Sequence, residues 1–195
     1  MPALSAGEAD CLRRMVMDTF AVSLQCHPQF PATGIESLQV QGRLAHGLHL
    51  EYRLEGDLGS LRLPRPGQQL EPDQLWAHSC CELFLARDGE RAYREYNFSP
   101  SGQWAGYGFS DYRERMGGLR LPAPEMRWRQ DARCLSLDVD LPMAALPPGD
   151  DELCLALTMV LQLADGSLSY WALQHPPGRP DFHHRAGFAL RPGPG

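Results

Sequence analysis

The stretch WAHSCCELFLARDGERAYREYNFSPSGQWAGYGF, residues 76–109, predicts three consecutive antiparallel strands. The expected strands cover residues 77–87, 92–98 and 103–110, and they are rich in the aromatic and aliphatic residues that strands favour. The segment DGER (88–91) has the composition of a hairpin turn. SPSG, which follows the second strand, predicts another turn in which Gly102 can take a positive φ.

Short strands separated by turns continue on both sides of this stretch. HLEYRLEG (49–56) alternates apolar and polar residues, as a strand with one buried face does. Almost no helix is expected, beyond one turn in LPMAALPPG (141–149). The further strands are expected at 18–25, 35–43, 48–56, 60–63, 125–141 (a pair joined at Asp131-Ala132), 152–164, 168–175 and 184–190. Roughly ten to thirteen short strands at regular spacing predict an all-β fold, a two-sheet antiparallel β-sandwich.

The 195 residues are expected to form one domain. Residues 1–17 show only weak helical periodicity and are interpreted as an N-terminal extension. Residues 18–190 form the predicted sandwich, and the Pro- and Gly-rich residues 191–195 a flexible tail. No internal repeat or interdomain linker is evident.

Composition excludes several classes of protein. The net charge is −6, and no basic cluster indicates a nucleic-acid partner. No run approaches the length of a membrane span, and no secretory signal is visible, so a cytoplasmic location is expected. All 18 basic side chains are arginine. The chain therefore has no Walker lysine and no lysine for a Schiff base.

The chain has 6 cysteines and no CxxC pair, so a structural zinc site is not expected. In a cytoplasmic protein they are expected to be reduced. Most are interpreted as small buried hydrophobic residues.

Three runs dense in aromatic and polar residues indicate a ligand-binding face: WAHSCCELFL (76–85), YREYNFSPSGQWAGYGFSDYRER (93–115) and SYWALQHPPGRPDFHH (169–184). In order and content they resemble bacterial DOMON-like domain proteins, which are relatives of the family 9 carbohydrate-binding modules. The resemblance extends from about Leu24 to Phe188. It implies a β-sandwich that binds a ligand, typically a sugar or haem, and does not catalyse a reaction. The sequence departs from the pattern at Cys81, where an aromatic residue is usual, and this departure would enlarge the pocket beside Glu82.

Tryptophans are the expected stacking platforms for a sugar ring, because a pyranose presents a flat apolar face. Trp104 and Trp171 are the first candidates and Trp76 the next. The alternative is that these indoles fill the core of the sandwich. Glu82 lies inside an apolar strand, where a carboxylate must be paired. It is expected to accept hydrogen bonds from sugar hydroxyls or to form a structural salt bridge with an arginine such as Arg94 or Arg113.

Alternation along 93–98 places Glu95 and Asn97 on one face of their strand, and Tyr96 and Phe98 on the other as core residues. Glu95 and Asn97 then face either solvent or a groove. The remaining candidate ligand-binding residues are Tyr112, Arg113, His175, Asp181 and His183.

Other functions remain open from sequence. His175, Asp181, His183 and His184 do not have a recognised metal-ligand spacing, so no metal is expected. Haem is possible as a cofactor, with Met159 and either His175 or His183 as axial ligands.

An enzyme is a further alternative. Glu82 and Glu95 could form a glycosidase pair if they faced each other across a cleft. No GxSxG elbow surrounds a serine. A protein-interaction module is the third possibility, and the sequence does not indicate an oligomeric state. The sequence favours a non-catalytic protein that binds a small molecule, most simply a saccharide, without a cofactor.

Overall fold

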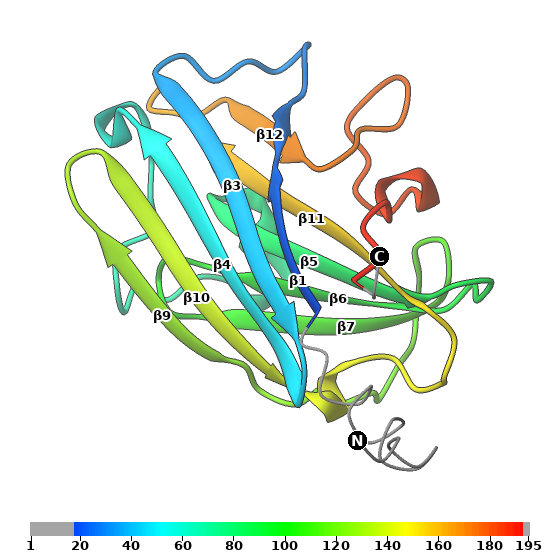
Figure 1. Ribbon diagram of the computed structural model, residues 1–195. Coiled ribbons are helices and arrows are strands. Elements are labelled where there is room, and N and C mark those ends of the chain that lie inside the picture. The colour runs from blue at the N-terminus through cyan, green and yellow to red at the C-terminus, as the bar shows by residue number, and fades with distance from the viewer. Residues whose placement is uncertain (1–17, 193–195) are drawn as a thin grey trace, which may run out of the picture.

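The computed structural model describes residues 18–192 and confirms the predicted fold: two antiparallel sheets pack face to face (Figure 1). The predicted N-terminal extension, residues 1–17, and residues 193–195 of the predicted tail lie outside the described residues.

Sheet A has five strands and sheet B has seven. In spatial order, sheet A contains β1 (Asp18–Ser23), β3 (Ile35–Leu44), β4 (Gly47–Gly56), β10 (Cys134–Pro142) and β9 (Glu125–Gln130). Sheet B contains β2 (Gln25–Cys26), β12 (Leu168–Ala172), β11 (Leu153–Gln162), β5 (Cys80–Arg87), β6 (Tyr93–Phe98), β7 (Trp104–Asp111) and β8 (Glu114–Arg115).

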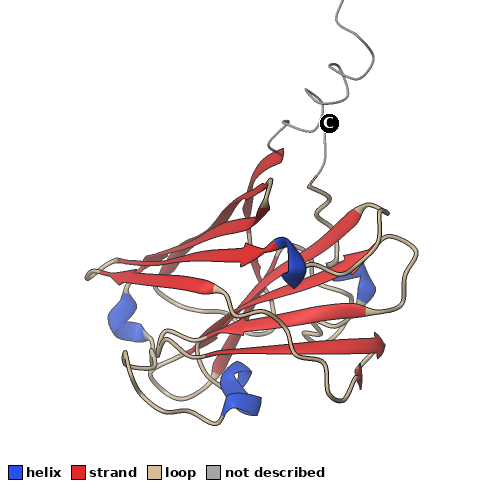
Figure 2. Cartoon of the chain, turned by 90° about the horizontal axis from the view of Figure 1, so that it is seen from below, coloured by secondary structure: helices blue, strands red, loops and turns tan. Residues whose placement is uncertain are grey.

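Helical structure in residues 18–192 is limited to short 3₁₀ turns outside the two layers (Figure 2). They are η1 (Leu58–Ser60), η2 (Pro72–Ala77), η3 (Met143–Ala145) and η4 (Arg185–Gly187). The helical turn expected in 141–149 is η3. None of these turns is long and apolar enough to cross a membrane.

The main core lies between the sheets, where alternate residues of each strand point inward. Leu50 and Leu54 of β4 pack in the same cluster as Leu83 of β5 and Leu157 of β11. The buried hydroxyl of Tyr52, also on β4, donates a hydrogen bond of 2.9 Å to the carbonyl oxygen of Glu82. This bond joins sheet A directly to the backbone of β5.

The outer face of sheet B is covered as well. Leu75 of η2 and Phe188, which follows η4, pack over Cys80, Phe84 and other outward-facing residues in a second apolar cluster. All but the last residue of β5 and of β11 is therefore buried. Covering this face positions the functional site, because polar side chains on these strands point into a second protein layer and not into open solvent.

Three sequence predictions of strands are wrong. Residues 18–25 divide into β1, which pairs with β3, and the start of β2, which pairs with β12 in the other sheet. Residues 60–63 contribute only a single bridge between Leu61 and Leu163. Residues 184–190 form η4, whose first turn is capped by His184, followed by one bridge between Leu155 and Leu190.

The five cysteines in the described part of the chain are free. Cys80 and Cys81 point to opposite faces of β5, and both are completely buried. Burial raises the pKa of both thiols well above the usual value.

We expect a titration of denatured, unreduced protein to find all six thiols of the sequence. In the native protein, a thiol reagent should leave Cys80 and Cys81 unmodified, because the reactive thiolate is suppressed and the sulfur atoms are inaccessible. Fewer than six thiols after denaturation would reveal a disulfide and contradict the expectation of a reducing compartment.

Candidate functional site

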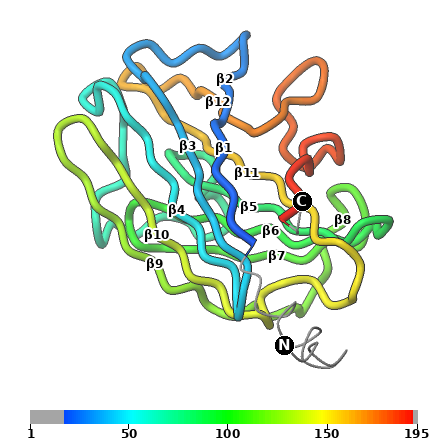
Figure 3. The backbone as a smooth tube through the Cα atoms, viewed as in Figure 1, coloured from blue at the N-terminus to red at the C-terminus, as the bar shows by residue number. Residues whose placement is uncertain are grey.

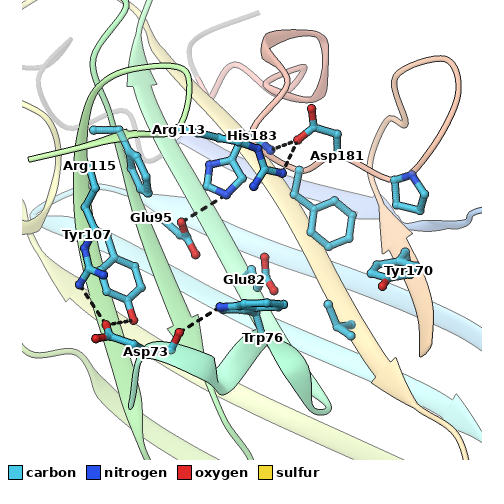
Figure 4. Close-up of a pocket in the computed structure, with 14 residues that line it drawn as sticks. Asp73, Trp76, Glu82, Glu95, Tyr107, Arg113, Arg115, Tyr170, Asp181 and His183 are labelled. Atoms are coloured by element: carbon cyan, nitrogen blue, oxygen red, sulfur yellow. Dashed lines mark hydrogen bonds and ion pairs between the residues drawn. The ribbon is translucent and has the colours of Figure 1, made fainter. Parts of the chain in front are cut away.

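A cavity of about 410 Å³ opens on the outer face of sheet B (Figure 4). Its floor is formed by side chains from the central strands, including Glu82 and Glu95. One side is formed by η2 and the other by the segment that follows β12. Strand alternation explains the floor: the residues that point away from the main core on β5, β6 and β7 all face this cavity or its apolar surroundings.

Glu82 and Glu95 are neighbours on this floor. Glu82 of β5 lies directly opposite Asn97 of β6, whereas Glu95 lies opposite Phe84, two residues along. The two carboxylates are thus diagonal neighbours on one face of the sheet. They are only 3% and 5% exposed, respectively.

Glu82 is buried, as expected, but the predicted salt bridge is not formed. Arg94 donates to the carbonyl oxygens of Ala144 and Leu146, and Arg113 pairs with Asp181. Within residues 18–192, Glu82 Oε1 has no hydrogen-bond partner. Burial first, and then the negative charge of Glu95, raise the pKa of Glu82 well above its usual value, while Arg113 lowers it.

Glu95 has more support from the protein. The side-chain amide of Asn97 donates to Glu95 Oε1 at 2.7 Å, and His183 Nε2 lies 3.8 Å from Oε2. Burial raises the pKa of Glu95 to about 7, against the opposing effects of Asn97, Arg113 and Arg115. Asn97 itself is fully buried, so it positions Glu95 and does not line the cavity.

His183 is neutral in this environment. Burial, and next the positive charge of Arg113, lower the pKa of His183 to about 4. The Tyr93 hydroxyl accepts a hydrogen bond from the backbone N–H of Arg113 and forms a second one with His183 Nδ1, 2.8 Å away. The other ring nitrogen, Nε2, faces Glu95.

Figure 3 traces the backbone of β7, β8 and the C-terminal segment. The side chain of Arg113 joins the turn between β7 and β8 to that segment. Its Nη2 donates to Asp181 Oδ1 at 2.9 Å, and the Tyr112 hydroxyl donates to Oδ2 at 2.8 Å. Among the described residues, Arg113 is the only non-glycine with positive φ, at 57°. Backbone conformations of this kind persist where surrounding contacts hold them, often at functional sites. Three predicted site residues, Tyr112, Arg113 and Asp181, are thereby brought together.

The opposite side of the cavity is held by a second ion pair. Asp73 on η2 accepts hydrogen bonds of 3.0 Å from Arg115 Nη2 and from the Tyr107 hydroxyl. The guanidinium of Arg115 lies over the Tyr107 ring, 3.9 Å from its centroid. Trp76, also on η2, is 52% exposed, and its indole N–H donates to the Asp73 carbonyl oxygen. Of these residues, sequence reasoning found only Trp76.

Trp104 and Trp171 do not line the cavity, and their prediction as stacking platforms is wrong. Both indoles point to the inner face of sheet B and pack in the main core. Trp171 lies opposite Met159, and Trp104 stacks on Tyr96. Alternation gives the reason, because Trp104 and the cavity residue Tyr107 are an odd number of positions apart and must face opposite ways.

His175 lies apart from the other predicted site residues. Its Nε2 is 2.9 Å from the carbonyl oxygen of Gln25, and its ring packs edge-on against His27. The aromatic residue of β12 that does line the cavity is Tyr170, whose ring also contacts Phe182.

The arrangement does not fit Met159 and His183 as the two axial ligands of one haem. Met159 is buried in the core between the sheets, whereas His183 lies on the outer face of sheet B. The two side chains cannot oppose each other across one iron. Residues 18–192 also contain no group of three or more His, Cys, Asp or Glu side chains placed to hold a metal ion.

No family model matches the sequence, and no curated protein matches it. Several solved structures are similar. One is a candidate carbohydrate-binding protein from Bacteroides uniformis, with a TM-score of 0.63 and 15% identity, covering 96% of this chain and 91% of that one. The second is a family 9 carbohydrate-binding module from Caldicellulosiruptor kristjanssonii in complex with glucose, with a TM-score of 0.53 and 8% identity. It covers 80% of this chain and 76% of that one.

The third structure is a family 9 module from the same organism in complex with cellotriose, with a TM-score of 0.50 and 8% identity. It covers 80% of this chain and 75% of that one. At these identities, the similarity establishes the fold shared with carbohydrate-binding modules.

Burial of Glu95 makes the stability of the protein dependent on pH. Its pKa rises from 4.5 to about 7 on folding, so the folded state retains a proton that the unfolded state releases within that range. The free energy of unfolding should therefore fall as the pH rises from about 4.5 to 7, by on the order of 3 kcal/mol. Urea denaturation between pH 5 and 8 measures this loss.

Glu95→Gln should reduce this pH dependence, because the glutamine keeps the oxygen that accepts from Asn97 and has no proton to lose. The part contributed by Glu82, whose pKa burial also raises, should remain. Glu114→Gln on β8 is the control, since Glu114 is exposed. An unchanged pH dependence in Glu95→Gln would contradict the assignment.

Proposed function

We propose that the protein is a non-catalytic binding protein for a saccharide or similar polyol, and that the ligand occupies the cavity on sheet B. One observation carries the proposal: Glu82 is a buried carboxylate on the cavity floor, and its Oε1 has no hydrogen-bond partner within residues 18–192. A buried polar atom without a partner destabilises the folded protein, so it is usually retained for a role. A sugar hydroxyl would supply the missing donor.

The cavity walls provide the other element of sugar recognition. Trp76 is largely exposed at the cavity, and Tyr170 and Phe182 contribute further aromatic surface. Aromatic faces contact the apolar face of a pyranose, while charged and amide groups held by other residues bond hydroxyls in fixed directions. Arg113 and Arg115 are held in this way by their aspartate partners.

The placement of the carboxylates favours binding over hydrolysis. Glycosidases flank the scissile bond with two carboxyl groups. Glu82 and Glu95 instead lie side by side on one sheet face, so both approach a ligand from the same direction. The complexes of the family 9 modules with glucose and cellotriose support a sugar as the ligand of this fold.

We also propose that the chain is a bacterial DOMON-like protein that acts in the cytoplasm. The free cysteines of the described residues agree with a reducing compartment.

Isothermal titration calorimetry with glucose, cellobiose and other mono- and disaccharides tests the proposed function. We expect dissociation constants on the order of micromolar to millimolar, since a small sugar buries little area. Trp76→Ala should weaken binding about fivefold, because it removes a stacking surface worth roughly 1 kcal/mol.

Met143→Ala is the matched control, because Met143 is a similarly exposed apolar residue on η3 that does not line the cavity. Its affinity should equal that of the unaltered protein. Failure of every saccharide to bind would refute the proposed function, and equal losses in the two variants would show that the ligand does not occupy this cavity.

A further inference from the structure

The cavity is lined by more acidic than basic side chains. Its carboxylates are Asp73, Glu82, Glu95 and Asp181, and its guanidinium groups are Arg113 and Arg115. Each arginine forms an ion pair with an aspartate, Arg115 with Asp73 at 3.0 Å and Arg113 with Asp181 at 2.9 Å. The two glutamates are left without a cationic partner of their own. Figure 4 shows them between the two ion pairs.

Among residues 18–192, no other group facing the glutamates supplies a positive charge. His183 is neutral for the reasons given above. The remaining titratable neighbours are uncharged when protonated, and burial raises the pKa of each. They are Tyr52 of β4, Cys80 and Cys81 of β5, Tyr93 of β6, Tyr107 of β7 and Tyr170 of β12.

The sheet gives Glu82 no hydrogen-bond donor. Thr158 of β11 and Asn97 of β6 lie directly opposite it on either side. Thr158 Oγ1, Glu82 Oε1 and Asn97 Oδ1 are all buried, and none has a hydrogen-bond partner within residues 18–192. Three oxygen atoms in one row across three strands therefore lack donors. Glu82 is the member of this row that borders the cavity, so a ligand there can contact its carboxyl group.

We propose that the ligand carries a protonated amine, as an amino sugar does, and that its ammonium group binds between Glu82 and Glu95. This inference rests on the proposed function and specifies the class of sugar. An ammonium group supplies N–H donors for the carboxyl oxygens and a positive charge that stabilises their ionised form. A neutral sugar supplies donors only, and would leave the charge of any ionised glutamate unbalanced in a buried site.

Proton release should accompany binding of the amine. In the free protein, burial raises the pKa of both carboxyls, to about 7 for Glu95, so Glu95 still carries its proton in part of the molecules near neutral pH. An approaching ammonium stabilises the carboxylate form. A carboxyl then gives its proton to solvent, and the resulting carboxylate pairs with the ammonium, which keeps its own protons. Binding should therefore weaken as the pH falls below about 7, the pKa of Glu95.

Calorimetric titration at pH 7 with glucosamine, glucose and N-acetylglucosamine tests the inference. Glucosamine should bind at least about tenfold tighter than either neutral sugar. In place of its ammonium group, glucose has a hydroxyl and N-acetylglucosamine has an uncharged amide. Repeating the titration in phosphate, PIPES and MOPS, which differ in ionisation enthalpy, counts the protons exchanged. We expect net release with glucosamine, beyond the protonation of the free amine by the buffer, and no release with glucose.

Glu82→Gln and Glu95→Gln should each abolish the preference for glucosamine and reduce the proton release. Glu114→Gln, an exposed change of the same kind on β8, should leave both unchanged. Thermal unfolding establishes that each variant is folded.

The outcomes separate the inference from the proposed function. Equal binding of glucose and glucosamine without proton release overturns the inference and supports the proposed function. Failure of every sugar to bind overturns both. A preference for glucosamine that persists in both glutamine variants overturns the assignment to these carboxylates. Proton release on addition of calcium chloride alone would also overturn it, because the pair would then bind a metal cation.

Discussion

The rest of the structure depends on the burial of sheet B on both of its faces. One face packs against sheet A, and the other is covered by η2 and the segment after β12. A strand in this position has no solvent-facing side on which to place polar residues. The few polar side chains on the outer faces of β5, β6 and β11 are therefore held in a low-dielectric layer, where each must find a partner or raise the energy of the fold.

That constraint explains the electrostatics of the cavity. Glu82 and Glu95 have raised pKa values because water is excluded, and desolvation is the largest cause for both. The two ion pairs on either side have a different role, since their partners are partly exposed and hold neighbouring segments in place. Exposed pairs of this kind contribute little to stability on their own. Their value lies in fixing η2 and the C-terminal segment against the sheet, so that the floor is enclosed.

Double burial also determines how much could be predicted from sequence. Strand positions between residues 77 and 110, the turns and the sandwich followed from composition and alternation. Alternation also separated Glu95 and Asn97 from Tyr96 and Phe98 correctly. It did not identify which face carries the cavity, because both faces of sheet B are rich in aromatic residues. Trp104 and Trp171 were assigned to the wrong face for that reason.

Asp73 and Arg115 could not be identified from local patterns. The former lies on a 3₁₀ turn and the latter on a two-residue strand, and their pairing depends on how distant segments meet. Tyr107 could be found by alternation once Phe109 was known to line the cavity. The two residues are two positions apart on β7 and therefore share a face.

Asp181 and His183 belong to a segment that the ribosome synthesises late. Both residues follow β12, the last strand in the described part of the chain. During synthesis every strand of both sheets leaves the ribosome before the segment that completes the cavity. The sandwich can therefore assemble first, with Glu82 and Glu95 still hydrated and ionised. Closure of the final segment over sheet B then removes that water, so the nascent domain takes up protons at the moment its binding site is formed.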